Sequence, residues 1–199
     1  MYAADSVLLS NKRTNVRKLK LLRDEFSFFY TDSVVLRDGR EATLRPLQPD
    51  DESAHRAFAA QLSSADLRQR FFRTIRGLSP AQWWRLIHID YRRDMAFIAT
   101  APDGQGNSET LGVARMVMES DWRSAEIALI VRSDLKRLGL GQALLERMLR
   151  YCCERGVRRV YGTILPDNTA MLALARKLGM QLQFVPGERV VAVSLELAS

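Results

Sequence analysis

Residues 131–149 read VRSDLKRLGLGQALLERML, and they combine the end of a strand, a short loop and the start of a helix. Gly139 and Gly141 stand where the loop becomes the helix, so the backbone there can approach a ligand closely. The first turn of a helix offers unpaired N–H groups and the positive end of the helix dipole. Because Lys136 and Arg137 come just before it, the segment predicts a binding site for an anion such as a pyrophosphate.

Two common nucleotide-binding motifs do not match this loop. A Walker A loop ends in Gly-Lys-Ser/Thr, whereas this one ends in Gly141-Gln142-Ala143. The dinucleotide-binding fingerprint requires a third glycine at the position that Leu144 occupies. Two glycines before a helix also occur in turns that bind nothing, so the loop alone does not identify a ligand.

Hydrophobic periodicity and turn signals predict the elements on either side of this loop. We expect a hairpin at 34–47, three helices between 49 and 87, strands at 95–100, 110–119 and 123–132, a helix at 139–154, a strand at 157–165, a helix at 168–180 and two closing strands. Strands 95–132 follow one another directly and should be antiparallel. The strand–helix–strand unit 123–165 should be parallel, with a right-handed crossover.

The expected fold class is therefore α/β (α+β), with a mixed, mostly antiparallel central sheet flanked by helices. The length of 199 residues suits one domain, which we place at 33–199 after a basic arm or helix at 1–32. The hydrophobic fraction of 47% excludes a disordered chain, and no apolar run is long enough to span a membrane. A clean signal peptide is also absent, so we expect a cytoplasmic protein.

The net charge of +7 comes from 30 basic and 23 acidic residues. The excess is thinly spread, so it is weak evidence for nucleic-acid binding. The histidines, His55 and His88, lie in separate helices without a second ligand nearby, so we expect no metal. Cys152 and Cys153 are sequence neighbours in a helix, and we expect both to be reduced.

The segment KRLGLG (136–141) resembles the Q/R-x-x-G-x-G/A acetyl-CoA motif of the GNAT superfamily of N-acetyltransferases. LPDNTAMLALARKLGM (165–180) is similar to the next motif of that superfamily, with Asn168 at its start. The resemblance covers roughly residues 33–197. A closer likeness, to the catalytic domain of bacterial Pat-type protein lysine acetyltransferases, is carried by SSADLRQRFF (63–72), HIDYRRDMAFIA (88–99), AEIALIVRSDLKRLGLG (125–141) and ARKLGM (175–180).

This resemblance implies a GNAT-like fold with a splayed pair of parallel strands, and acetyl-CoA as cosubstrate. In that superfamily the strand before the glycine loop binds the pantetheine arm through its backbone, and the loop amides bind the pyrophosphate. A β-bulge near 128–130 would polarise the thioester carbonyl. The implied cofactor-binding residues are Ile130, Val131, Arg132, Lys136, Arg137, Leu138, Gly139, Leu140, Gly141, Gln142 and Asn168.

The Pat-type resemblance also implies that Glu126 is the general base. A lysine ammonium must lose a proton before it can attack a thioester, and Glu126 stands among apolar residues, where partial desolvation would favour this role. The alternative is an ordinary outward-facing strand residue. Many GNAT enzymes have a tyrosine as general acid at the position of Ala175, and Pat-type domains resemble this chain in lacking it. Tyr161, a bound water or departure as thiolate remain candidates.

The acceptor is the least defined part of the prediction. Asp90, Tyr91 and Asp94 precede the third strand of the expected order, where GNAT proteins shape the acceptor site, so they could attract a cationic side chain. The leading acceptor is a protein lysine. The alternatives are a small amine and a non-catalytic acyl-CoA-binding module, and a monomer and a dimer are both open. We expect the helical face of Arg68, Arg70, Arg73 and Arg76 to be solvated, although it could also meet an acidic partner or the 3′-phosphate of coenzyme A.

Overall fold

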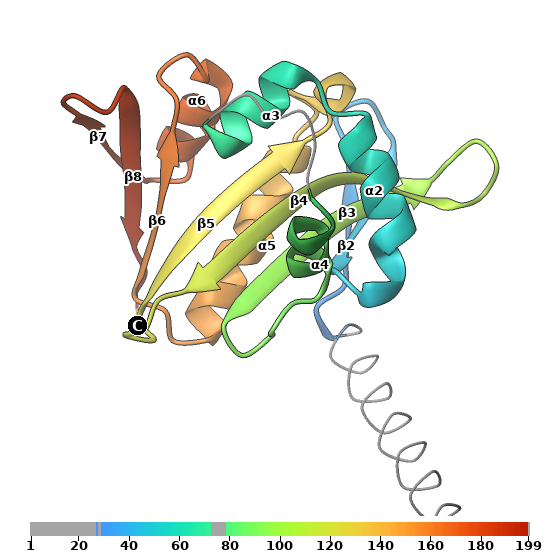
Figure 1. Cartoon of the computed structure of the whole chain (residues 1–199), viewed down its shortest axis with the longest axis horizontal. Helices are drawn as coiled ribbons and strands as arrows, with labels where there is room; N and C mark the ends of the chain where they lie inside the picture. Colours follow the sequence, from blue (N-terminus) through green and yellow to red (C-terminus); the bar gives the residue numbers. More distant parts are fainter. Residues whose placement is uncertain (1–26, 28, 73–78, 199) are drawn as a thin grey trace, which may run out of the picture.

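The computed structural model describes residues 27, 29–72 and 79–198, and these form a single eight-stranded sheet with helices on both faces (Figure 1). The strands lie in the order β1-β2-β3-β4-β5-β6-β8-β7. Their bounds are β1 Asp32–Val35, β2 Glu41–Pro46, β3 Asp94–Pro102, β4 Ser108–Met118, β5 Ser124–Val131, β6 Arg159–Ile164, β7 Gln181–Val185 and β8 Val190–Glu196. Neighbouring strands are antiparallel except β5 and β6, which are parallel, so the predicted fold class is confirmed.

The apolar core has two layers, one on each face of the sheet, and each layer is covered by helices. The helical segments are η1 Pro49–Asp51, α2 Glu52–Ala60, α3 Ser64–Phe71, α4 Pro80–Ile87, η2 Ser133–Leu135, α5 Leu140–Glu154 and α6 Thr169–Lys177. The larger core layer lies beneath α5 and α6, and the smaller one packs Phe58 of α2 and Ile87 of α4 against the sheet. The helices predicted between residues 49 and 180 all form.

Helix α3 begins with a capping box at its first turn. The Ser63 hydroxyl accepts from the Asp66 amide at 3.1 Å, and the Asp66 carboxylate accepts from the Ser63 amide at 3.1 Å. These two bonds satisfy donors that a helix start leaves unpaired. The helix ends at Phe72, whose φ of 57° is left-handed and breaks the helical path. Asp66 is thereby buried beneath α3, facing the loop after β5.

The parallel strands β5 and β6 separate soon after they meet. Their pairing covers only Ser124–Glu126 with Arg159–Tyr161, and the strands diverge beyond it (Figure 1). The last close approach is at Gly162, where a Cβ would lie 2.9 Å from the Ile127 carbonyl oxygen. The splayed strand pair implied by the family resemblance is therefore present, and it opens toward the glycine loop.

The amino-terminal arm expected at 1–32 lies largely outside the described residues. Of its described part, Tyr30 packs edge-on against Tyr151 with ring centroids 5.3 Å apart, and Asp32 is the first residue of β1. Cys152 is buried and Cys153 exposed, and both are free thiols, as predicted. No helix in the described ranges has the length and apolar character needed to cross a membrane.

Candidate active site

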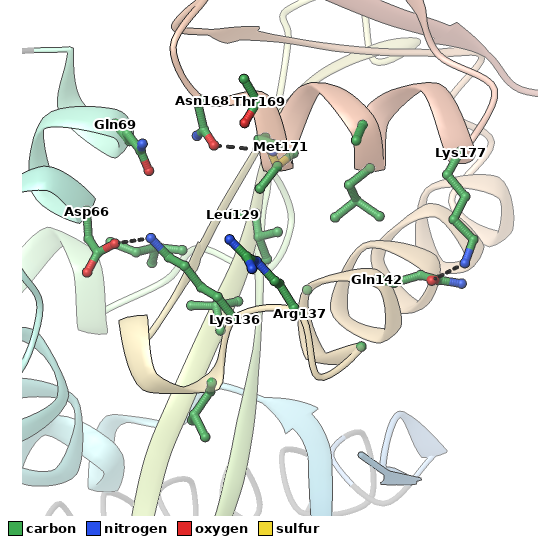
Figure 2. Close-up of a pocket in the computed structure, with 18 of the residues that line it drawn as sticks. Asp66, Gln69, Leu129, Lys136, Arg137, Gln142, Asn168, Thr169, Met171 and Lys177 are labelled. Atoms are coloured by element: carbon green, nitrogen blue, oxygen red, sulfur yellow. Dashed lines mark hydrogen bonds and ion pairs between the residues drawn. The ribbon is translucent and has the colours of Figure 1, made fainter. Parts of the chain in front are cut away.

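A pocket of about 660 Å³ opens between α3, the loop after β5 and the start of α6 (Figure 2). The first turns of both α5 and α6 line it, so two helix amino ends border one space. Most of the predicted cofactor-binding residues come together here. Those that line the pocket are Ile130, Val131, Lys136, Arg137, Gly139, Gly141, Gln142 and Asn168.

The glycine loop presents backbone donors at the pocket. The amides of residues 137–142 have no hydrogen-bond acceptor among the described residues, and the first regular helical bond is from Ala143 to Gly139, at 3.0 Å. Gly139 has a φ of 93°, a conformation that residues with a Cβ rarely adopt. Leu140 is wholly buried and Leu138 packs on the core, so both can contribute to the pocket only through the backbone.

The side chains around the pocket are strongly cationic. Five cations line it and one carboxylate, a net charge of +4: Arg37, Arg70, Lys136, Arg137 and Lys177 against Asp66. Of the five, Arg137 extends from the loop into the space between α3 and α6 (Figure 2). Asn168 caps α6 by accepting from the Met171 amide at 3.2 Å. Charge, free amides and volume all fit a large phosphorylated ligand such as coenzyme A.

Lys136 plays a different part from the one its position predicts. Its ammonium donates to the Asp66 carboxylate, which also accepts from the Ser133 and Ser63 hydroxyls. Asp66 is only 3% exposed. Burial works to raise the pKa of Asp66, but these hydrogen bonds outweigh it and hold the pKa below its ordinary value. Lys136 therefore ties the loop to α3, and much of its charge is neutralised there.

The hairpin between β1 and β2 supports the loop from the other side. The Arg37 amide donates to the Leu138 carbonyl at 3.0 Å, and the Arg37 guanidinium donates to the Arg137 carbonyl at 3.2 Å. Arg137 has a left-handed φ of 67°, which a non-glycine residue tolerates only when its surroundings hold it. These two bonds therefore position the residue that points into the pocket.

The predicted β-bulge near Ala128 is absent, because β4 and β5 pair in regular register from Gly112–Val131 to Met118–Ala125. The Arg132 amide donates to the Leu111 carbonyl, so its alternate neighbours Ile130 and Ala128 also turn their peptide groups toward β4. The peptide groups of Leu129 and Val131 then face the opening beside β6. A backbone donor for a thioester carbonyl would accordingly come from Leu129.

Arg132 lies outside the pocket, and its functional groups are engaged elsewhere. Its carbonyl accepts from the Leu135 amide, and its guanidinium pairs with Glu109 at 2.7 Å and Asp134 at 2.8 Å. These contacts close the turn after β5. The backbone of Arg132 is therefore not available to a cofactor, because its donor and its acceptor both have protein partners.

Glu126 stands at the last registered pair before β5 and β6 separate. Its side chain is exposed, between the buried Ala125 and Ile127. It lines a second cavity, of about 50 Å³, that shares Gln69, Arg70, Leu129, Asn168 and Met171 with the large pocket. A ligand bound at the loop can thus reach the carboxylate along the opening between the two strands.

A row of side chains crosses the sheet at Glu126. The strand register aligns Asp94 with Val117, Val117 with Glu126, and Glu126 with Tyr161. Cross-strand partners project from the same face, so the carboxylates of Asp94 and Glu126 belong to one surface, two strands or about 10 Å apart. Val117 between them is 41% exposed. Asp94 itself pairs with Arg115 at 2.7 Å.

The other acceptor and acid candidates are partnered within the protein. Asp90 is exposed and pairs with Arg92 at 3.1 Å, and Tyr91 donates its hydroxyl proton to the Leu47 carbonyl. Tyr161 donates to the Glu119 carboxylate, and this bond raises the pKa of Tyr161 to about 12. Ala175 is buried in the core beneath α6. In the described residues no group of three or more His, Cys, Asp or Glu could hold a metal ion.

Comparison with known proteins agrees with this geometry. The family model of the GNAT acetyltransferase domain matches residues 41–181. The chain belongs to the GNAT acetyltransferase family. Acetyltransferase PA5475 of Pseudomonas aeruginosa is 31% identical over 77% of this chain and 82% of its own length. The acetyltransferase Pat of Mycolicibacterium smegmatis is 28% identical over 82% of this chain, which spans only 48% of that relative.

Among solved structures, the GNAT domain of S. lividans PAT superposes with a TM-score of 0.77 at 28% identity. The match covers 85% of this chain and 98% of that domain. This GNAT protein is therefore an acyltransferase that uses acetyl-CoA as cosubstrate, and its fold is the one that the sequence motifs predict.

Sequence reasoning missed several residues at this GNAT site. Arg70 was expected on a solvated face, but it is partly buried and lines the pocket, whereas Arg68 is exposed; Arg73 and Arg76 lie outside the described residues. Asp66 and Arg37 were not singled out. The Ser63-x-x-Asp66 capping pattern was a usable signal for Asp66, but nothing local to Arg37 indicates that its hairpin supports a loop a hundred residues away.

Proposed function

We propose that this GNAT enzyme transfers an acetyl group from acetyl-CoA to the ε-amine of protein lysines, with Glu126 as general base. The observation that carries the proposal is the continuity of the two cavities, which leads from the cationic loop pocket to Glu126. The loop amides and Arg137 would bind the pyrophosphate, and the peptide groups of Leu129 and Val131 would bind the pantetheine arm. Acetyl-CoA supplies the activated thioester.

The chemistry follows from the arrangement around Glu126. An incoming ammonium gives a proton to the Glu126 carboxylate, and the free amine attacks the thioester carbonyl carbon. The Leu129 amide, turned toward the opening, would stabilise the charge that develops on the carbonyl oxygen. The C–S bond then breaks, the nitrogen loses its second proton to give the amide, and the departing thiolate takes up a proton. Tyr161 is a poor candidate for protonating it, because its hydroxyl proton is already donated to Glu119.

A protein acceptor suits the exposed surface better than a small amine. A site for a small cation is expected to be an enclosed acidic pocket, whereas Glu126 is exposed in a row with Asp94, Val117 and Tyr161. Such a row offers carboxylates for a lysine ammonium and apolar surface for its methylenes. The likeness to Pat proteins supports the same acceptor class, and we place the reaction in the cytoplasm, where acetyl-CoA and such proteins meet.

A direct test is to incubate the chain with acetyl-CoA and two panels of acceptors, lysine-containing proteins and small amines, and to identify products by mass spectrometry. Transfer to lysine side chains is the expected result. Transfer to small amines alone would replace the proposal with a small-molecule enzyme. Binding of acetyl-CoA with transfer to no amine would identify a non-catalytic acyl-CoA-binding module instead.

A further inference from the structure

Three cavities of this protein meet at one side chain, Arg70 of α3. It lines the large loop pocket, the cavity beside Glu126 and a third cavity of about 60 Å³ beneath α2 and α4. No carboxylate among the described residues lies within ion-pair distance of its guanidinium. Its neighbour Arg115, which acts to lower its pKa, is paired with Asp94. The guanidinium lies over the Phe71 ring, with Cζ 5.1 Å from the centroid. A partly buried guanidinium without a carboxylate partner in the described ranges favours an anionic ligand, because its charge is poorly solvated.

Burial lowers the pKa of Arg70, and the charge of Glu126 acts to raise it. The two side chains therefore interact electrostatically without forming an ion pair. Arginine keeps its proton throughout the physiological range, so the group remains cationic. The guanidinium therefore places a positive charge where the three cavities meet, and this charge is present before any ligand binds.

The third cavity holds a second polar group without a partner. His55 of α2 is 7% exposed, and its Nδ1 atom has no hydrogen-bond partner. Burial lowers the pKa of His55 to about 4, so the imidazole is neutral at physiological pH. The other walls are mostly apolar and include Phe58, Leu62 and Ile130. An apolar cavity with an imidazole nitrogen that lacks a hydrogen-bond partner and a guanidinium that lacks a carboxylate partner suits a short chain that is apolar along its length and polar at its end.

This cavity lies beside the segment of β5 where the thioester is expected. Ala128 lines both the third cavity and the one beside Glu126, and Ile130 lines both the third cavity and the loop pocket. Glu126, Ala128 and Ile130 alternate along β5 and so project from one face of the sheet. An acyl group attached to a thioester in the opening can therefore extend from Glu126 toward His55.

We propose that the third cavity is an acyl subsite for short acyl groups that end in a carboxylate, such as malonyl and succinyl, and that Arg70 binds that carboxylate. The inference rests on the proposed function, in which an acyl-CoA lies along β5. A volume of about 60 Å³ holds about four to six groups of water size. The CH₂–CH₂–COO⁻ end of a succinyl group has five non-hydrogen atoms, so it fits, and the neutral His55 imidazole supplies an additional hydrogen bond.

The transfer itself is the same as for acetyl. The amine nitrogen bonds to the acyl carbon, the C–S bond breaks, and coenzyme A leaves as a thiolate that takes up a proton. Overall, an ammonium and a thioester give an amide, a thiol and one proton released to solvent. The distal carboxylate takes no part in bond making, so Arg70 acts on the choice of acyl group.

The test compares the binding of two thioesters of matched length, succinyl-CoA and butyryl-CoA, to the full chain without acceptor, by calorimetry. The charged contact predicts that succinyl-CoA binds about 10- to 100-fold more tightly. Arg70→Gln should abolish this preference, and Arg70→Met gives a second variant of similar side-chain length. Arg68→Gln is the matched control, since Arg68 lies on the same helix, pairs with Asp167 at the surface and should leave the preference intact.

Three results would overturn the acyl subsite: butyryl-CoA bound as tightly as succinyl-CoA by the wild-type chain, a preference retained by both Arg70 variants, or an equal loss of both thioesters in those variants. The first comparison needs no variant and so does not depend on their folding. A succinyl preference with no transfer to any amine would support the subsite and refute the proposed function, so the two failures are distinguishable.

Discussion

The two ends of β5 differ in which part of the polypeptide makes the site. At the carboxyl end, toward Val131, the pocket is built from backbone amides, two helix starts and a glycine with positive φ. At the amino end, Glu126 belongs to a row of side chains from four different strands. The first arrangement suits a ligand that a whole family has in common. The second can change by substitution of single side chains, so the proposed acceptor site can vary without altering the loop pocket.

The largest expected effect is at the amino end. Glu126→Gln removes the proposed general base and keeps the shape of the side chain, so kcat/KM for amine acetylation should fall about 10²- to 10⁴-fold. The dissociation constant for CoA should stay unchanged, since the loop pocket is intact. Glu41→Gln, an exposed strand carboxylate on β2, is the matched control. Full activity in the Glu126 variant would mean that another group is the base, and it would contradict the proposed division of roles between the two ends of β5.

At the carboxyl end, Asp66→Asn should weaken the link between α3 and the loop. Losing the buried carboxylate leaves Lys136 without its partner and should lower the free energy of unfolding by about 1–3 kcal/mol at neutral pH. Because the pKa of Asp66 is held low in the folded protein, its stabilisation is present above the ordinary value of 3.8 and is lost as pH falls through the folded pKa.

Denaturant titrations of wild type and Asp66→Asn at several pH values check this prediction. The difference between the two proteins should be largest near neutrality and shrink as the pH is lowered below 3.8. A difference that stayed constant over that range would mean that the carboxylate charge contributes nothing, and that Lys136 is free to serve the ligand.

The glycine conformation itself gives a somewhat smaller effect. Gly139→Ala places a Cβ on a backbone with a φ of 93°, which costs about 1–2 kcal/mol of strain. If the strain shifts the loop amides, affinity for CoA should fall about tenfold, since 1.4 kcal/mol corresponds to a factor of ten. Gly106→Ala is matched, with a φ of 83° in the turn between β3 and β4. Both variants should lose stability, but the Gly106 variant should bind CoA normally.

The smallest effect is expected at Asp90. It is exposed and its partner Arg92 is two residues away, so Asp90→Asn should change kcat/KM for a lysine peptide less than about twofold, the scale of an exposed ion pair. Asp94→Asn, in the row with Glu126, should have the larger effect on KM. A larger effect of Asp90→Asn than of Asp94→Asn would place the acceptor on the loop before β3 and would extend the acceptor end of the site to that loop.

The same contrast explains which features could be predicted from the sequence. Glycine spacing, helix starts and strand order are local, so the loop pocket and the splayed parallel pair could be predicted. The absent bulge in β5 could not, because strand register depends on the partner strand. The expectation that Arg68 and Arg70 share one solvated face was wrong, because residues two apart on a helix point in different directions.

Asp66 and Arg37 show the limit of local reasoning. The capping pattern predicts that Asp66 closes a helix turn, but its ion pair with Lys136 joins segments 70 residues apart. Arg37 reaches Arg137 across 100 residues. Such contacts depend on the packing of the whole domain, and no pattern within a short window contains them.

The short pairing between β5 and β6 has a further consequence for how the domain responds to force and heat. Only three registered residue pairs join strands β1–β5 to strands β6, β8 and β7. We call these two parts of the sheet its panels, and the short β5–β6 ladder between them its seam. The large pocket takes lining from both sides of that seam, Leu129–Val131 on one panel and the helix that follows β6 on the other. A ligand bound there would contact both parts of the sheet and hold them together. Each turnover would then loosen the protein as product departs, and the cell's supply of cosubstrate would set how tightly the two panels are held.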